Sequence, residues 1–333
     1  MAGPAELSLI ICTYRRPAAV AALLEALRGQ TRLPDEILVV DASPGGETEA
    51  LMRSLASLRG LRYEKPPPEH RGLTRQRNYG VARASGEVIA FLDDDAVPAP
   101  SYCEQLLACF ARHPGAVGVG GYVEGVAWRS AGEGKPPLSA YRFAGWERRE
   151  DLRWRLRRIL GLAPALPPGW MPPCGHGRPA GFLPPDGEDH PVESVLGCAM
   201  AWRRRVFESL RFSPYFEGYG LYEDLDFCIR AARLGPVLLC TRARLRHEHA
   251  PAGRPDAFRY GVMVVRNGWF VWRRRWPRPG FADRARWWAT TLVLAGCRLA
   301  SGAGGRQAAL LEALGRLWAV PGMLLRPPRE DRP

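Results

Sequence analysis

Strand-like and helix-like segments alternate along the first 125 residues, and this order restricts the fold more than any other feature of the sequence. Short runs of apolar and β-branched residues predict strands at 7–12, 36–40, 88–92 and 117–119. The segments between them predict helices at 17–28, 47–58, 74–84 and 101–112. This alternation is typical of an α/β fold with a doubly wound, mostly parallel sheet flanked by helices, whose ligands bind at the carboxyl ends of the strands.

Polar residues follow three of these predicted strands. In chain order they are Thr13, Tyr14, Arg15, Asp41, Asp93, Asp94 and Asp95. Three adjacent carboxylates repel one another unless a cation neutralises them, and hard oxygen ligands on a strand end suit Mg²⁺ or Mn²⁺. The alternative is a solvated acidic turn before Pro98. Because parallel strands bring their carboxyl ends to one edge of a sheet, we expect these residues to converge on one crevice.

The alternation breaks beyond residue 125. The stretch from about 125 to 192 holds nine prolines between Pro164 and Pro191, and we interpret it as a long loop excursion over the sheet. Regular structure is predicted again at 195–202, then in helices from 204 and over 223–234, and in a strand at 237–240.

Two further groups of polar residues fall in the second half of the chain. Glu223 and Asp224 open a predicted helix, where acids also serve simply to complement the helix dipole. His247 and His249 are two residues apart, so on a strand they would share one face as metal ligands. A structural role is the alternative for each pair, and only their order in the chain is specific.

That order resembles the family 2 glycosyltransferases over about residues 7–275. The resemblance is carried by six motifs, which are LIICTYR at 9–15, VVDAS at 39–43, GLTRQRNYG at 72–80, FLDDD at 91–95, EDLD at 223–226 and RHEHAP at 246–251. It implies a GT-A fold and an inverting enzyme that moves a sugar from a nucleotide diphosphate to an acceptor hydroxyl. It also implies a divalent cofactor, Mg²⁺ or Mn²⁺, which stabilises the departing diphosphate.

The resemblance also implies roles for individual residues. Thr13 and Tyr14 would line the nucleotide site, Asp41 would bind the base, Asp93 would face the ribose, Asp95 and His247 would be metal ligands, and Asp224 would be the catalytic base. We assign Asp94 to the nucleotide-sugar site as well, and Arg15, Arg71 and Arg77 as hydrogen-bond donors to phosphate oxygens. On the acceptor side we expect Gly197, Trp202 and Glu223.

We divide the chain into a catalytic domain, residues 1–258, and a basic helical tail, residues 259–333. Within the first, 1–125 is the predicted nucleotide-sugar half, 125–192 the Pro-rich excursion and 193–258 the acceptor and catalytic half. The tail carries 14 Arg against 4 acidic residues, a net charge of +10, and six of the 11 tryptophans. This composition suits an anionic membrane surface, although the apolar faces of the tail would equally suit packing on the catalytic domain.

The expected location is cytoplasmic, with peripheral attachment to the inner face of the cell membrane as an option. The eight cysteines are scattered and fit free thiols in a reducing compartment, and we expect no signal peptide. The longest uncharged stretch of the tail, 287–297, is shorter than the roughly 20 apolar residues that cross a bilayer. The expected partners are a nucleotide diphosphate sugar and a glycan or lipid-linked acceptor, as in cell-envelope polysaccharide or glycolipid assembly.

Three other functions fit parts of the sequence. A sugar nucleotidyltransferase of related fold would carry an early Gly-rich phosphate loop, where this chain has Thr-Tyr-Arg-Arg-Pro at 13–17. A nucleic-acid-binding protein would be basic throughout, whereas residues 1–258 carry a net charge of only +3, 33 basic against 30 acidic residues, so we expect no nucleic-acid partner. A non-catalytic relative would have no need to keep the acidic and histidine motifs together.

Overall fold

The computed structural model describes residues 7–55, 57–216, 218–248, 255–325 and 327–328. The chain forms two compact units, the first comprising residues 1–125 and 185–254 and the second residues 126–184 and 255–333. Each unit is therefore assembled from two separate stretches of sequence. The segment that we interpreted as a loop excursion groups with the C-terminal stretch in the second unit.

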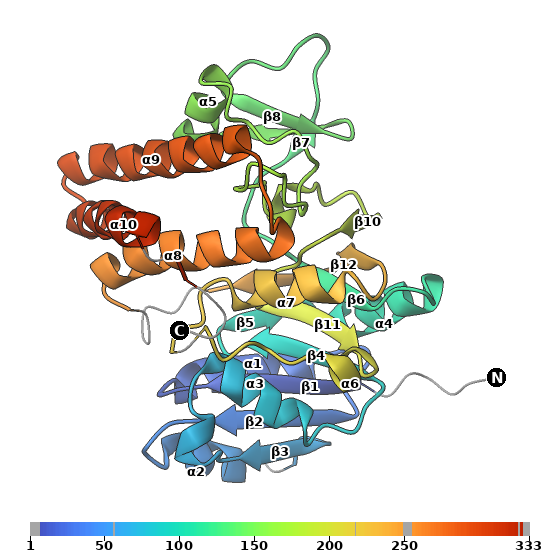
Figure 1. Cartoon of the computed structure of the whole chain (residues 1–333). Helices are drawn as coiled ribbons and strands as arrows, with labels where there is room; N and C mark the ends of the chain where they lie inside the picture. The colour runs from blue at the N-terminus through green and yellow to red at the C-terminus, as the bar shows by residue number, and fades with distance from the viewer. Residues whose placement is uncertain (1–6, 56, 217, 249–254, 326, 329–333) are drawn as a thin grey trace. The chain divides into compact units, whose positions relative to one another are not determined.

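One mixed sheet forms the centre of the first unit (Figure 1). Its described strands are β1 (Leu7–Thr13), β2 (Glu36–Asp41), β3 (Leu61–Glu64), β4 (Val88–Asp93), β5 (Ala96–Pro98), β6 (Gly118–Val123), β10 (Asp189–Val192), β11 (Ala199–Arg203) and β12 (Val237–His247). They lie in the order β10-β12-β6-β11-β4-β1-β2-β3, and β5 pairs with β12. Strands β3, β2, β1 and β4 run parallel, as do β6 and β12, whereas β11 is antiparallel to both of its neighbours.

Helices lie against both faces of this sheet. They are α1 (Pro17–Arg28), α2 (Glu47–Ser54), α3 (Leu73–Val81), α4 (Tyr102–Arg112), α6 (Val206–Ser209) and α7 (Glu223–Ala231), with a 3₁₀ turn, η1, at Pro68–His70. Because side chains alternate along a strand, Leu9 of β1 joins one core with α1 and α4, while Ile10 faces Gly80 of α3. The expected α/β fold with a mostly parallel, helix-flanked sheet and a helical C-terminal region is confirmed.

Strand pairing brings the predicted polar residues to one edge of the sheet. In the parallel register Thr13 lies opposite Asp41, and Cys12 lies opposite Asp93. The last residue of β12, His247, pairs with Ala96 of β5, directly after the three aspartates. The strand predicted at 237–240 therefore continues to the histidine, which gives His247 a fixed backbone position.

The second unit has its own small sheet and helices. Its elements are β7 (Arg129–Ser130), β8 (Ala140–Phe143), β9 (Trp146–Arg149), α5 (Leu152–Ile159), η2 (Ala180–Phe182), α8 (Ala257–Arg275), α9 (Phe281–Ala303) and α10 (Gln307–Leu325). The Pro-rich segment packs on the helices, since the indole N–H of Trp272 donates to the Pro173 carbonyl at 2.8 Å and that of Trp276 to the Met171 carbonyl at 3.3 Å. The Pro-rich segment is therefore held by hydrogen bonds from Trp272 of α8 and from Trp276, the residue that follows this helix.

Helix α10 packs against α8 through small residues. A Cβ atom at Gly315 would overlap the carbonyl oxygen of Phe258, and one at Gly261 would overlap that of Glu312. On the same helix Ala313 is completely buried, whereas Leu314 is 44% and Trp318 73% exposed. None of the helices described is both long enough and apolar enough to cross a membrane.

Candidate active site

Three carboxylates and one imidazole meet where β4 ends. Asp93 is the last residue of β4, and Asp94 and Asp95 form the turn into β5. Nε2 of His247 lies 2.8 Å from Oδ1 of Asp95 and 3.9 Å from Oδ2 of Asp93. The two residues predicted as metal ligands, Asp95 and His247, are therefore in contact.

Asp94 has a different environment from its two neighbours. Its carboxylate accepts hydrogen bonds from Thr13 Oγ1 at 2.7 Å and from Arg16 Nη1 at 2.9 Å. Burial raises the pKa of Asp94 to about 6, although both hydrogen bonds oppose that rise. Asp94 thus ties the end of β1 to the acidic turn, and its oxygens are already engaged within the protein.

The second strand end forms the other side of the same edge. Asp41 is completely buried, and its carboxylate accepts from the Ser43 backbone N–H at 2.8 Å and from the Tyr63 hydroxyl at 3.0 Å. Arg15 has a left-handed backbone with φ 57°, and its N–H donates to Ser43 Oγ at 2.7 Å. Beside it, Tyr14 is 45% exposed at the edge where a ligand of an α/β sheet binds.

Arg77 connects the acidic turn to the predicted catalytic helix. Its guanidinium is 2% exposed, forms an ion pair with Glu223, and donates to Asp93 Oδ1 at 3.3 Å and to the Gly197 carbonyl at 3.1 Å. The rings of Phe91 and Phe212 lie 5.7 and 5.4 Å from the guanidinium carbon. These contacts occupy Arg77 within the protein, so the expected donation to a phosphate is replaced by a role in positioning other residues.

Asp224 lies beside this network at the start of α7. Its Oδ2 accepts from the Gly197 N–H at 2.8 Å and its Oδ1 from the Leu225 N–H at 2.8 Å. Burial raises the pKa of Asp224, and it raises the pKa of Glu223 to about 8 although the Arg77 guanidinium opposes that. Oε2 of Glu223 has no hydrogen-bond partner among the described residues, so the ion pair with Arg77 through Oε1 is what compensates this buried carboxylate.

The glycosyl transferase family 2 model matches residues 8–160. The O-antigen chain rhamnosyltransferase RfbN of Salmonella typhimurium is 30% identical over 271 residues, an alignment that covers 79% of this chain and 74% of that protein. The chain belongs to glycosyl transferase family 2. This membership confirms the resemblance found in the sequence motifs.

Other curated glycosyltransferases match over shorter stretches. The glucosyl-dolichyl phosphate glucuronosyltransferase of Haloferax volcanii is 28% identical over 120 residues, 35% of this chain and 38% of that protein. For several curated relatives the match spans between 29% and 38% of their length. Family membership therefore rests on the long alignment with the rhamnosyltransferase.

A solved structure shows that the fold is shared. The mannosyltransferase PcManGT from Pyrobaculum calidifontis, in complex with GDP-Man and Mn²⁺, is 16% identical with a TM-score of 0.52, covering 97% of this chain and 87% of that one. The likeness confirms the expected GT-A type of fold.

Two of the residues that we predicted to belong to the site lie apart from the carboxylate cluster. Trp202 is fully buried, with its ring 5.1 Å from Phe227, because its position on β11 directs it into the aromatic core; it cannot face an acceptor, and that prediction is wrong. Arg71 is exposed before α3, and no contact among the described residues joins it to the cluster. His249 lies outside the described residues.

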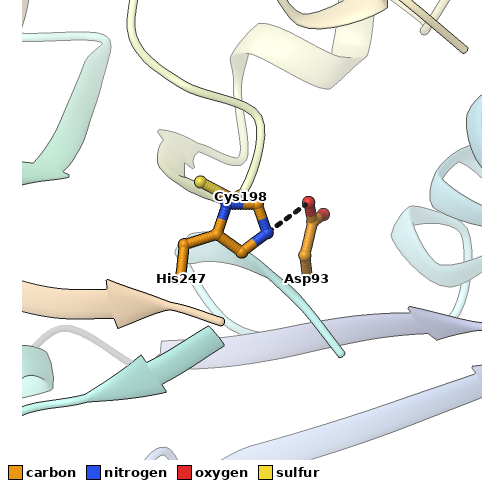
Figure 2. Close-up of side chains that lie close together, drawn as sticks. All are labelled: Asp93, Cys198 and His247. Atoms are coloured by element: carbon orange, nitrogen blue, oxygen red, sulfur yellow. Dashed lines mark ion pairs between the residues drawn. The ribbon is translucent and has the colours of Figure 1, made fainter. Parts of the chain in front are cut away.

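Two residues that the motifs did not single out belong to the cluster. Arg16 Nη1 lies 2.9 Å from Asp94 and 3.7 Å from Asp95. Cys198 lies beside His247 and Asp93, as Figure 2 shows. Cys198 lies between the predicted acceptor-side residues Gly197 and Trp202 in the sequence, but only strand pairing reveals that it lies beside His247, which is 49 residues further along the chain.

The donor set of the cluster fits a divalent metal ion. Asp95 and His247 offer a carboxylate oxygen and an imidazole nitrogen in contact with each other. Asp93 adds a second carboxylate, whose Oδ2 lies 3.9 Å from Nε2 of His247. Carboxylates suit Mg²⁺ and Mn²⁺, while an imidazole ligand favours transition metals over Mg²⁺. These residues are able to hold such an ion.

Proposed function

We propose that this chain transfers a glycosyl group from a nucleotide diphosphate sugar to an acceptor hydroxyl, with inversion at the anomeric carbon. One observation carries the proposal. Arg77 links Asp93, in the metal-binding cluster, to Glu223 and Gly197, which flank the carboxylate of Asp224. A donor-side cluster and a candidate base are thereby held in one network.

Asp224 is the proposed base. Each of its oxygens accepts one backbone hydrogen bond, which leaves lone pairs for the proton of an acceptor hydroxyl. Its raised pKa makes it a stronger base than an exposed aspartate, and a positioned base contributes typically about 10²–10⁴-fold in rate. The hydroxyl attacks on the face opposite the leaving diphosphate, which gives inversion.

Asp95 and His247 would hold the divalent ion, Mg²⁺ or Mn²⁺. When bound, that ion supplies positive charge against the negative charge that develops on the diphosphate. Thr13, Tyr14, Arg15 and Asp41 remain the proposed nucleotide contacts. Gly197 remains on the proposed acceptor side because it holds the base.

The first test is a panel of nucleotide sugars with Mn²⁺, read by thermal unfolding, since a ligand that binds only the folded chain raises its stability. Release of the nucleotide diphosphate, with candidate acceptors added, then measures turnover. Asp224→Asn should lose about 10²–10⁴-fold in rate while keeping donor binding. No stabilisation by any nucleotide sugar, with and without Mn²⁺, would contradict the donor class.

The long alignment with an O-antigen rhamnosyltransferase supports a place in cell-envelope polysaccharide or glycolipid assembly. We propose a glycan or lipid-linked acceptor on that basis. A screen of radiolabelled transfer to lipid-linked and free oligosaccharides would distinguish the two.

We further propose that helix α10 attaches the protein to an anionic membrane surface. Exposed apolar side chains occupy an arc of about 120° on this helix, taking 100° per residue, and they are Leu310, Leu311, Leu314, Leu317, Trp318 and Leu325. The last 75 residues carry a net charge of +10, which suits anionic lipid headgroups.

Co-sedimentation with phosphatidylglycerol vesicles tests the attachment. The double variant Leu314→Gln/Trp318→Gln should bind at least about tenfold more weakly, because each large apolar side chain contributes on the order of 1.5–3 kcal/mol when buried. Leu234→Gln is the matched control, since Leu234 is 49% exposed in the first unit. Binding that is absent, or unchanged in the double variant, would contradict the proposal.

A further inference from the structure

Three side chains from distant parts of the sequence lie close together at the edge of the sheet (Figure 2). They are Asp93, Cys198 and His247, and one ligand atom from each lies within 4.8 Å of the other two. The Cys198 residue is 7% exposed, and the side chains of Asp93 and His247 are 34% and 18% exposed. A thiol therefore lies in the inner wall of the proposed metal centre.

Strand pairing fixes this arrangement. Leu92 of β4 pairs with Ala199 of β11, so the next residues outward, Asp93 and Cys198, leave the sheet side by side. His247 ends β12 opposite Ala96, two residues after Asp94. Backbone hydrogen bonding, rather than flexible loops, thus sets the positions of two of the three donors and constrains the third.

The separations suit a single ion. Donor atoms at about 2.0–2.3 Å from one tetrahedral ion lie roughly 3.5 Å apart, so rotation of the side chains can close separations below 4.8 Å. A thiolate ligand selects Zn²⁺ and other thiophilic ions, whereas Mg²⁺ and Mn²⁺ prefer oxygen. A site with carboxylate, imidazole and thiolate ligands and one open position is a donor set that Zn²⁺ accepts readily.

We propose that Cys198 is a sulfur ligand of the centre formed with Asp93 and His247, and that this centre binds Zn²⁺, Co²⁺ and Cd²⁺ more tightly than Mg²⁺ or Mn²⁺. The inference rests on the metal site of the proposed function. It adds that sulfur, not carboxylate alone, decides which ion the protein retains.

A second cluster of possible metal ligands, also in the first unit, provides an internal control. Cys109, His113 and Asp189 also lie within 4.8 Å of one another. There, however, Arg112 already donates to both oxygens of Asp189, at 2.9 and 3.1 Å, so its negative charge is neutralised. We expect this second group to bind Co²⁺ far more weakly.

The experiment titrates the full-length, chelator-treated protein with Co²⁺ and follows the near-ultraviolet absorption of thiolate–Co²⁺ charge transfer. We expect one saturable band in the unmodified protein and in the Cys109→Ser and Cys12→Ser variants. Cys198→Ser should lose the band and bind Zn²⁺ on the order of 100-fold more weakly in a chelator competition, while Mn²⁺ affinity changes little.

The Cys198→Ala variant tests whether a serine hydroxyl can bind the ion in place of the thiol, because alanine offers no ligand atom. Circular dichroism checks that both variants are folded. Loss of the band in Cys109→Ser, its persistence in Cys198→Ser, or Co²⁺ binding without any band would overturn the proposal. Such a result would leave the transferase proposal intact, because nucleotide-sugar binding with Mn²⁺ is measured separately.

Discussion

Arg77 illustrates how one buried charge organises the site. It is 2% exposed and holds Glu223, Asp93 and the Gly197 carbonyl at once. A buried arginine is costly to desolvate and is retained only when such partners compensate it. Arg77 holds the carbonyl of Gly197, and the N–H of the same glycine donates to the carboxylate of Asp224. These contacts explain why Asp224 has a defined orientation.

We predict that Arg77→Met lowers the free energy of unfolding by about 3–5 kcal/mol, because Glu223 is left buried and uncompensated. The double variant Arg77→Met/Glu223→Gln should recover a large part of that loss. Urea denaturation measures both. Arg75→Gln on the same helix, whose side chain donates to the Glu69 carbonyl, should change stability by less than about 1 kcal/mol. Equal stability of Arg77→Met and the unmodified protein would contradict the account.

His176 gives the second unit a dependence on pH. Burial lowers the pKa of His176 to about 3, and its Nε2 lies 3.0 Å from Thr291 Oγ1. The unfolded chain takes up a proton near pH 6.5 that the folded chain accepts only near pH 3. The stabilising contribution of the neutral His176 imidazole is thus fully present above pH 6.5, and it is lost as the pH falls toward 3.

The expected loss is at most about 1.4 kcal/mol per pH unit from this group. Thermal unfolding of the unmodified protein and of His176→Gln, from pH 7 to pH 5, isolates the contribution as the difference between the two slopes. Parallel slopes would contradict this account, because they would show that His176 takes up its proton over the same pH range in the folded and unfolded chains.

At the scale of elements, the contact between α8 and α10 depends on glycine. Backbones approach so closely at Gly315 and Gly261 that no Cβ fits. We predict that Gly315→Ala destabilises the protein by about 1–3 kcal/mol or more, because the added carbon forces the helices apart. Chemical denaturation followed by tryptophan fluorescence measures this.

Gly296 of α9 is the matched control, since an added Cβ there meets no atom within 4 Å. Gly296→Ala should stabilise by about 0.5–1 kcal/mol, because alanine restricts the unfolded chain and favours helix. A loss of stability at position 296, or none at 315, would contradict the packing argument.

At the scale of the whole molecule, every proposed ligand contact belongs to the first unit. We therefore propose that the first unit carries donor binding and catalysis, and that α10 in the second unit carries membrane attachment. Hydrogen exchange with UDP or GDP plus Mn²⁺ should protect amides around Thr13, Asp41 and Asp95 and leave those of α9 unchanged. EDTA or Asp95→Ala should weaken that protection, whereas protection confined to the second unit would refute the assignment.

The sequence by itself determined the α/β fold and the edge at which the polar residues gather. Its strands and helices alternate, and parallel strands must bring Thr13, Asp41 and Asp93 to the same side. The resemblance to the family also implied that Asp95 and His247 bind the same ion, and the two side chains are in contact.

Only the tertiary structure decided which side chains on those elements face the site. Strand pairing turned Trp202 into the core and Cys198 toward His247, although both lie in the same apolar run. Packing of α3 buried Arg77, and close approach at Gly315 placed alanines of α10 inside and leucines outside. These outcomes depend on contacts between segments far apart in the chain, which no local pattern of residues specifies.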